Sequence, residues 1–217
     1  MMPDYHPGQE LLMDYAAGAQ REPVALLVAT HISMCPSCQA EVRRLESLGG
    51  AMLETLEPEP MAEEALDHAL ARLESSGKAE PTPAARPSAG DPRLPRPLRD
   101  YLDGSLDGAS WKRRGVFAEL ALLEDVPGFK TRLLRIKGGA TMPQHTHEGS
   151  ELTLVLAGSF RDAAGHYRPG DVALADASVD HQPVADPGED CLCLAVTDAP
   201  LRLTGTFGRY LNFLTRY

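Results

Sequence analysis

The spacing of hydrophobic positions changes near the middle of the chain. Before residue 78, apolar residues recur three and four positions apart, which is the period of one face of an α-helix. The members of four such stripes are Leu11, Leu12 and Tyr15; Val24, Leu27, Val28 and His31; Val42, Leu45, Leu48, Met52 and Leu56; and Ala62, Ala65, Leu66, Ala69, Leu70 and Leu73. We therefore predict four short helices in this part of the chain.

After residue 97 the pattern changes to short apolar runs separated by glycine, proline and aspartate. Such runs are typical of strands joined by turns. The runs are LLRIKGG, ELTLVLAG, YRPGDVALAD, DCLCLAVTDAP and LRLTG. This part of the chain is predicted to form an all-β domain, with a short helix at residues 98–102 before its strands.

Residues 78–97 separate the two patterns. This segment contains six prolines and no apolar periodicity, so it is suited neither to a helix nor to an interior strand. We expect an exposed linker here. The predicted fold class is multidomain α + β, with a small four-helix domain at residues 1–77, the linker at 78–97 and an all-β domain at 98–217. A chain of 217 residues suffices for two modest cores.

The composition is that of an ordinary soluble protein, with 43% hydrophobic and 24% charged residues. No stretch approaches the run of about 18 apolar residues that spans a bilayer. The first residues carry acids where a secretory signal needs basic residues and a continuous apolar stretch. The sequence therefore predicts a cytoplasmic protein that has no membrane partner.

The formal charge of −10 is unevenly distributed. Residues 1–77 contain 13 acidic residues against four arginines, whereas the remainder, with 18 acidic and 17 basic residues, is nearly neutral. An acidic surface repels a phosphate backbone, which argues against direct binding of nucleic acid and is compatible with a basic protein partner. A solvated acidic surface without any partner explains the same count.

A candidate metal site lies between the second and third predicted helices. His31, Cys35 and Cys38 follow the pattern H-x3-C-x2-C, which can bring one imidazole and two thiolates to one point. Zn2+ favours this donor set. Two small buried residues at a helix start are the alternative for the cysteines, but the added histidine favours zinc. A fourth ligand is expected from His6, the only histidine before the first helix, with His68 as the weaker candidate.

A second candidate metal site lies in the β-rich part. His145 and His147 are two residues apart and so project from one face of a strand, and Glu151 returns to that face after a turn. With Gly139 and Gly158 these residues match the first cupin motif at every defined position. The resemblance implies a double-stranded β-helix barrel with the three ligands inside it.

The second cupin motif is less regular. A turn at residues 165–171 resembles its beginning, and His181 stands at the position of its histidine, so we expect His181 as a fourth ligand. The residues that depart from the motif are Asp176, Ser178 and Ala185. Three histidines and one glutamate suit Zn2+, Fe2+, Mn2+ or Ni2+. Glu151 could instead support the ligands from outside or act as a general base, as in an enzyme.

Cys191 and Cys193 are one residue apart in a predicted strand, so both thiols should face the same way. Two interpretations are open. They are small hydrophobic residues of the barrel core, or they share a face with the metal ligands and are oxidised by a signal.

The first 75 or so residues, with His6, the DYAAGA stretch and His31, Cys35 and Cys38, resemble the zinc-binding anti-sigma factors of the ChrR type. The same two modules in the same order extend this resemblance to nearly the whole chain. It implies a regulator of a stress response and not an enzyme. Its helical domain would wrap an extracytoplasmic-function sigma factor and block the contact of this factor with core RNA polymerase.

The resemblance further implies zinc in the cupin domain and release of the sigma factor on singlet oxygen or a related oxidant. The alternative is a metal-dependent cupin enzyme of the dioxygenase or isomerase type, in which the N-terminal module serves assembly only. A stable one-to-one complex with a sigma factor would discriminate the two functions.

Overall fold

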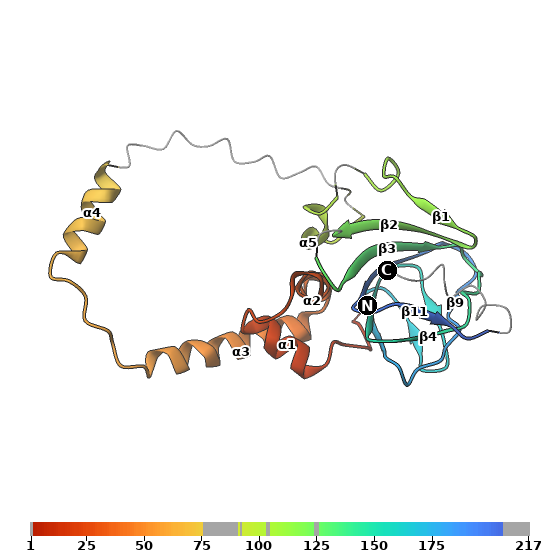
Figure 1. Cartoon of the computed structure of the whole chain (residues 1–217), viewed down its shortest axis with the longest axis horizontal. Helices are drawn as coiled ribbons and strands as arrows, with labels where there is room; N and C mark the ends of the chain where they lie inside the picture. Colours follow the sequence, from red (N-terminus) through yellow and green to blue (C-terminus); the bar gives the residue numbers. More distant parts are fainter. Residues whose placement is uncertain (1, 76–90, 92, 103–104, 124–125, 206–217) are drawn as a thin grey trace.

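The computed structural model describes residues 2–75, 91, 93–102, 105–123 and 126–205. It consists of a helical part and a β-barrel that lie against each other (Figure 1). The predicted multidomain α + β fold is therefore confirmed. Among the described residues, no helix combines the length and the apolar character needed to cross a membrane.

All four predicted N-terminal helices are present. Their bounds are α1 (Gln9–Ala16), α2 (Glu22–Met34), α3 (Pro36–Glu54) and α4 (Ala65–Ser75). Helices α1, α2 and α3 pack together, and α2 is the most buried because apolar residues cover most of its circumference. Pro36 starts α3, where its missing N–H costs nothing, so the chain turns between α2 and α3 at Cys35.

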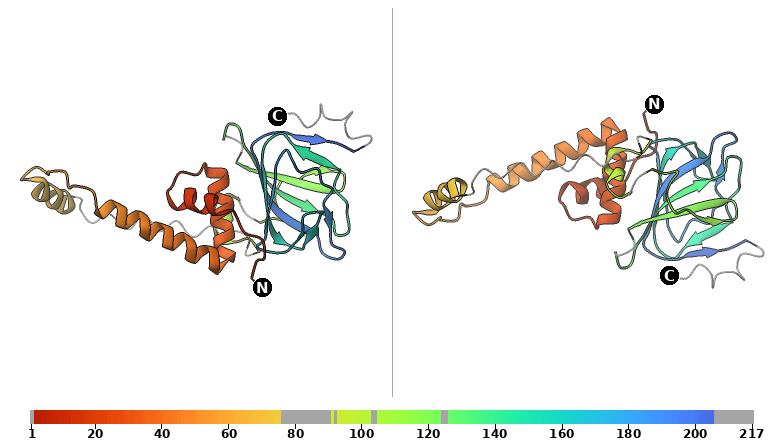
Figure 2. Two further views of the ribbon diagram at one scale, coloured as in Figure 1. Left: turned by 90° about the horizontal axis from the view of Figure 1, so that it is seen from below. Right: turned by 90° about the horizontal axis from the view of Figure 1, so that it is seen from above.

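Helix α4 does not share the core of the other three. It has no buried residue, and Figures 1 and 2 show α3 and α4 extending away from the barrel as an arm. The apolar stripe of α4 is exposed, with Leu66 at 66% and Leu70 at 48% of full accessibility. The stripe predicted a helix correctly, but no described part of this chain covers it.

The barrel is built from antiparallel strands in two layers. The largest sheet has the order β1-β2-β3-β10-β5-β8, and two smaller sheets, β11-β4 and β7-β6-β9, complete the wall. The strand bounds are β1 (Lys112–Arg114), β2 (Phe117–Leu123), β3 (Lys130–Ile136), β4 (His145–His147), β5 (Glu151–Ala157), β6 (Phe160–Arg161), β7 (His166–Tyr167), β8 (Val172–Ala175), β9 (Val184–Ala185), β10 (Cys191–Thr197) and β11 (Leu201–Leu203). The predicted all-β cupin barrel is confirmed.

The outer face of the large sheet packs against α2. Side chains of β5 and β10 such as Leu154 and Leu194 join Leu27 and Val28 of α2 in one hydrophobic core. The opposite faces of the same strands point into the barrel, where Val155 lies in a second, smaller cluster. The helical part and the barrel therefore share a continuous core instead of being joined only by a linker.

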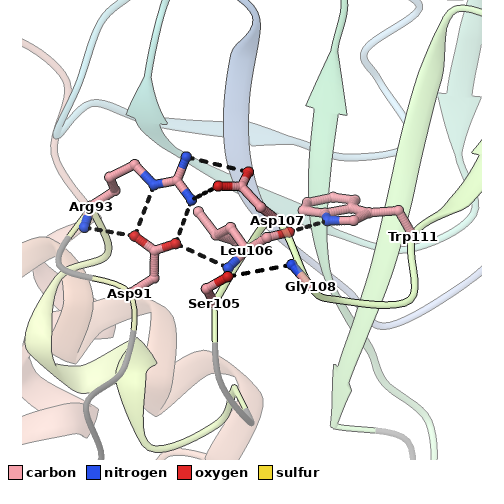
Figure 3. A network of polar contacts seen from close by, with 7 residues as sticks. All are labelled: Asp91, Arg93, Ser105, Leu106, Asp107, Gly108 and Trp111. Atoms are coloured by element: carbon pink, nitrogen blue, oxygen red, sulfur yellow. Dashed lines mark hydrogen bonds and ion pairs between the residues drawn. The ribbon is translucent and has the colours of Figure 1, made fainter.

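The end of the expected linker is anchored. Residues 76–90 and 92 lie outside the described residues, but Leu94 is buried and α5 (Arg96–Arg99), the predicted short helix, packs against α2. Figure 3 shows the Asp91 carboxylate accepting hydrogen bonds from Arg93 and from the backbone N–H of Leu106. These contacts fasten the start of the second domain to the body of the protein.

Candidate metal centres and the contact between them

The first metal site predicted from the sequence is assembled at the junction of α2, α3 and the N-terminal segment. One ligand atom from each of His6, His31, Cys35 and Cys38 lies within 4.8 Å of all the others. The Nδ1 atom of His6 is 3.3 Å from Sγ of Cys38 and 3.5 Å from Sγ of Cys35. His68 lies on the exposed helix α4 and does not belong to this group.

The hydrogen bonds and pKa shifts of His31 and Cys38 are compatible with a bound metal ion. Nδ1 of His31 donates a hydrogen bond of 2.7 Å to the carbonyl of Gly170, which leaves a lone pair on Nε2, and this buried Nε2 has no hydrogen-bond partner. Burial lowers the pKa of His31, which favours the neutral ring. Burial and the neighbouring Cys35 raise the pKa of Cys38 to about 12. A cation would stabilise the thiolates here, as a soft or borderline ion such as Zn2+ does.

The second group lies inside the barrel. His145 and His147 project from β4, and His181 follows β8 and forms a backbone bridge with His145. The Nε2 atom of His181 is 3.2 Å from Nε2 of His145 and 3.3 Å from Nε2 of His147. All three rings are buried. The structure thus brings together the three histidines that the two motifs predicted.

Two of these rings are oriented by hydrogen bonds from their outer nitrogens. Nδ1 of His145 donates to the carbonyl of Pro143 at 2.8 Å, and Nδ1 of His181 lies 2.7 Å from the buried Asp162 carboxylate. A donating Nδ1 leaves Nε2 as the metal-binding lone pair, and such partners also raise the basicity of the ligand. Asp162 was missed by the sequence analysis, because it belongs to no motif and lies 19 residues from His181.

Glu151 lies beside the histidines. Its Oε2 is 4.0 Å from Nδ1 of His147, and its Oε1 accepts a hydrogen bond from Thr153. The carboxylate therefore faces the outer nitrogen of His147, and it falls outside the group of three converging Nε2 atoms. Coordination by Glu151 stays a prediction.

A cavity of about 240 Å³ adjoins this group. It is lined by His145, His181 and Glu151 and also by Cys193. The Sγ atoms of Cys191 and Cys193 are 3.5 Å apart, and both cysteines are fully buried. Cys193 therefore shares the face of the metal ligands and at the same time belongs to the interior hydrophobic cluster.

The N-terminal residues 3–7, which we call the N-terminal clasp, bind to the barrel. The Asp171 carboxylate accepts hydrogen bonds from the backbone N–H groups of Asp4 at 2.7 Å and Tyr5 at 3.0 Å. The carbonyl of Tyr5 accepts one from Val172, the first residue of β8. The ring of Tyr5 packs on Tyr167 with 4.6 Å between centroids. His6 is thus held against the first metal site by contacts with the second domain.

The turn before β8 touches the first metal site from the other side. Gly170, whose carbonyl accepts from His31, has a φ of +97°, and a Cβ atom there would lie 2.7 Å from Pro3. Only glycine fits this left-handed position and this close approach. The turn at residues 168–171 therefore holds two ligands of the first site, His6 through the clasp and His31 directly. Strand β8, which follows it, contributes Ala173 to the wall of the cavity.

The fold and these two groups define a protein that combines a helical His/Cys site with a cupin barrel. Residues 106–200 match the family described as the ChrR Cupin-like domain. The chain is 42% identical over 198 residues to the anti-sigma-E factor ChrR of Cereibacter sphaeroides, and the match covers 91% of each protein. The chain therefore belongs to the ChrR family of anti-sigma factors.

A solved structure agrees with this assignment. The crystal structure of Rhodobacter sphaeroides SigE in complex with the anti-sigma ChrR contains a chain that superimposes with a TM-score of 0.76 at 38% identity. The match covers 89% of this chain and 98% of that one. The similarity thus includes the helical part as well as the barrel.

Proposed function

We propose that this protein is an anti-sigma factor that sequesters an extracytoplasmic-function sigma factor through its N-terminal helices. It would meet this partner in the cytoplasm, where RNA polymerase works. The family membership supports the class of protein, and the relative in the solved complex is bound to SigE. The observation that carries the proposal for this chain is the apolar surface of the arm formed by α3 and α4.

This arm surface is too apolar to remain in water without a partner. Its exposed members are Leu48, Met52, Leu53, Leu56, Met61, Leu66, Leu70 and Leu73. An isolated 11-residue helix is marginal in water, so α4 needs a partner to bury its stripe. Each leucine that a partner covers contributes about 1.5–3 kcal/mol. The acidic residues of this region favour a basic, helical partner, and a sigma factor of matching surface would satisfy both requirements.

The two metal groups have different roles in this proposal. His6, His31, Cys35 and Cys38 would hold Zn2+ and tie α2, α3 and the N-terminal clasp into one unit, because three short helices have a small core of their own. In the barrel, the three histidines would hold Zn2+ or another divalent transition metal, with Glu151 as the additional ligand expected from the motif. A metal there supplies an electrophilic centre beside the cavity.

We assign a separate function to each part of the chain. Residues 1–77 bind the sigma factor, and residues 98–217 detect an oxidant such as singlet oxygen. Residues 78–97 connect these two parts. The contacts of the turn at residues 168–171 with the clasp and with His31 support this assignment, because they provide a physical route from the barrel to the inhibitory helices. A change at the cavity wall would reach the first metal site through β8 and this turn.

Co-expression of the full chain with an extracytoplasmic-function sigma factor of the same organism tests the proposal. We expect a one-to-one complex in size-exclusion chromatography, and we expect Leu66→Asp combined with Leu70→Asp to weaken it at least 100-fold, since two apolar contacts are replaced by charges. The matched control is Leu174→Asp, on the barrel surface at 61% exposure, which should leave binding unchanged.

Equal binding by the arm variant and the control would refute the assigned surface. If the full chain forms no complex at all, the result favours the alternative function, a metal-dependent cupin enzyme.

A further inference from the structure

The cavity of the barrel is apolar along most of its wall. Its lining includes Phe117, Leu134, Ile136, Phe160 and Leu203. The space exists because one row of the large sheet carries small side chains at its centre, with Ala195 on β10, Thr153 on β5 and Ala173 on β8 paired across the strands. A cavity of about 240 Å³ suits a small organic molecule, since pockets for larger ligands reach about 300–1,000 Å³.

The same row begins with a charged residue. Arg132 on β3 pairs across the sheet with Ala195, and its side chain is part of the cavity lining. It is the single cation among the lining residues that the structure describes. Its Nε atom is buried and has no hydrogen-bond partner. A buried donor of this kind calls for an acceptor, and an arginine in the wall of an apolar cavity selects an anion.

The carboxylate next to Arg132 does not neutralise it fully. Glu119 is 3.3 Å from Nη1 of Arg132 and 3.0 Å from Nε of Arg114, so one carboxylate serves two guanidinium groups. Among the residues that the structure describes, Arg132 therefore shares its carboxylate partner with a second guanidinium, and a bound anion would offset the positive charge that remains.

The metal group lies at another part of the same cavity. Glu151 stands on β5, two strands from Arg132 with β10 between them, a backbone separation of about 10 Å at the usual strand spacing. A molecule of about five to eight carbon atoms suits this span and a cavity of about 240 Å³.

We propose that the barrel binds a small organic acid with one carboxylate and an apolar body, and that Arg132 is the residue that anchors the carboxylate. The apolar body lies along Phe117, Leu134 and Ile136, and its far end reaches the side of the cavity formed by His145 and His181. This site does not require that the helical part bind a sigma factor.

Calorimetric titration of the full-length protein with hexanoate, and with hexanamide as the uncharged isostere, tests the proposal. We expect hexanoate to bind at least 10-fold more tightly than hexanamide. Arg132→Gln should weaken hexanoate at least 10-fold and leave hexanamide unchanged, whereas Arg132→Lys should retain part of the preference. The matched control is Arg135→Gln, which removes an arginine from the same strand, where it lies over the ring of Trp111 and is no part of the cavity wall, so it should leave the preference for hexanoate intact.

Three results would overturn the proposal. They are equal affinity of the wild-type protein for both probes, absence of hexanoate binding, and unchanged hexanoate affinity in Arg132→Gln, which would place the carboxylate on the metal instead. Thermal unfolding of each variant without ligand separates misfolding from loss of the anchor. If Arg132→Gln does not fold, Ala173→Phe provides the second variant, because it fills the cavity from β8 and should abolish binding of both probes.

Discussion

The carboxylate of Asp171 lies at the contact between the N-terminal clasp and the barrel, and its replacement by asparagine tests whether the barrel controls the first metal site. In the wild-type protein the buried carboxylate accepts three backbone hydrogen bonds, from Asp4, Tyr5 and Arg168. Asparagine can accept the first two through its single oxygen. Its amide group then faces the N–H of Arg168, donor against donor.

The magnitude follows from these three bonds. A hydrogen bond to a charged group contributes about 1.5–3 kcal/mol and a neutral one about 0.5–1.5 kcal/mol. Asp171→Asn therefore loses one charged bond, about 2 kcal/mol, and weakens two others by about 1 kcal/mol each, about 4 kcal/mol in total. Because the clasp positions His6, the part of this loss that reaches the ligand should lower the affinity of the first site for its metal by up to about 100-fold.

Cobalt substitution provides the assay. The thiolate-to-cobalt absorption band reports the first site alone, since Cys35 and Cys38 are the cysteines of the candidate groups. Titration against a competing chelator gives the affinity. The matched control is Asp190→Asn, which removes a carboxylate that accepts a backbone N–H from Gly138, away from the clasp.

A double-mutant cycle decides whether the effect passes through His6. In the His6→Ala background, Asp171→Asn should cause little further loss of affinity, because the ligand that the clasp holds is already absent. An equal loss in both backgrounds would refute the argument. So would an unchanged affinity of the single variant.

Three further predictions follow from the other contacts. Hydrogen bonds from Arg93 hold the pKa of Asp91 well below its usual range near 4. The stability that Asp91 contributes is therefore complete above about pH 5 and is lost as the pH falls below it. Chemical denaturation from pH 7 to pH 3 should show a steeper decline of the unfolding free energy for the wild-type protein than for Asp91→Asn. Asp162→Asn should weaken the metal affinity of the barrel about 10- to 100-fold and leave the cobalt–thiolate band of the first site unchanged, as measured by metal analysis after dialysis. His147→Ala should still bind the sigma factor but fail to release it in cells exposed to the oxidant; a reporter gene that induces normally in this variant would show that the barrel metal has no part in sensing.

Much of the fold and of both metal sites could be predicted from the sequence, because the relevant signals are local. The spacing of His31, Cys35 and Cys38 describes one turn between two helices, and His145 and His147 are separated by one pleat of a strand. Helical stripes and short apolar runs likewise depend on neighbours within a few residues. These features locate the helices, the strands and most of the candidate ligands.

The tertiary structure alone decided the contacts that join distant segments. Nothing near His31 indicates that its outer nitrogen donates to Gly170, 139 residues later, or that Asp162 orients His181. The same holds for Arg132, which the sequence presents as one basic residue of a strand among several. Such partners meet only when the strands are wound into a barrel and the clasp is laid against it.

The apolar stripe of α4 shows both what the sequence determines and what it leaves open. The sequence by itself determined that residues 65–75 form an amphipathic helix, since the period of the apolar positions is intrinsic to the segment. It could not determine what covers that face, because burial depends on which surfaces lie within reach after folding. The structure leaves Leu66 and Leu70 exposed, while Leu94, in a segment expected to be an exposed linker, is buried against the body of the protein.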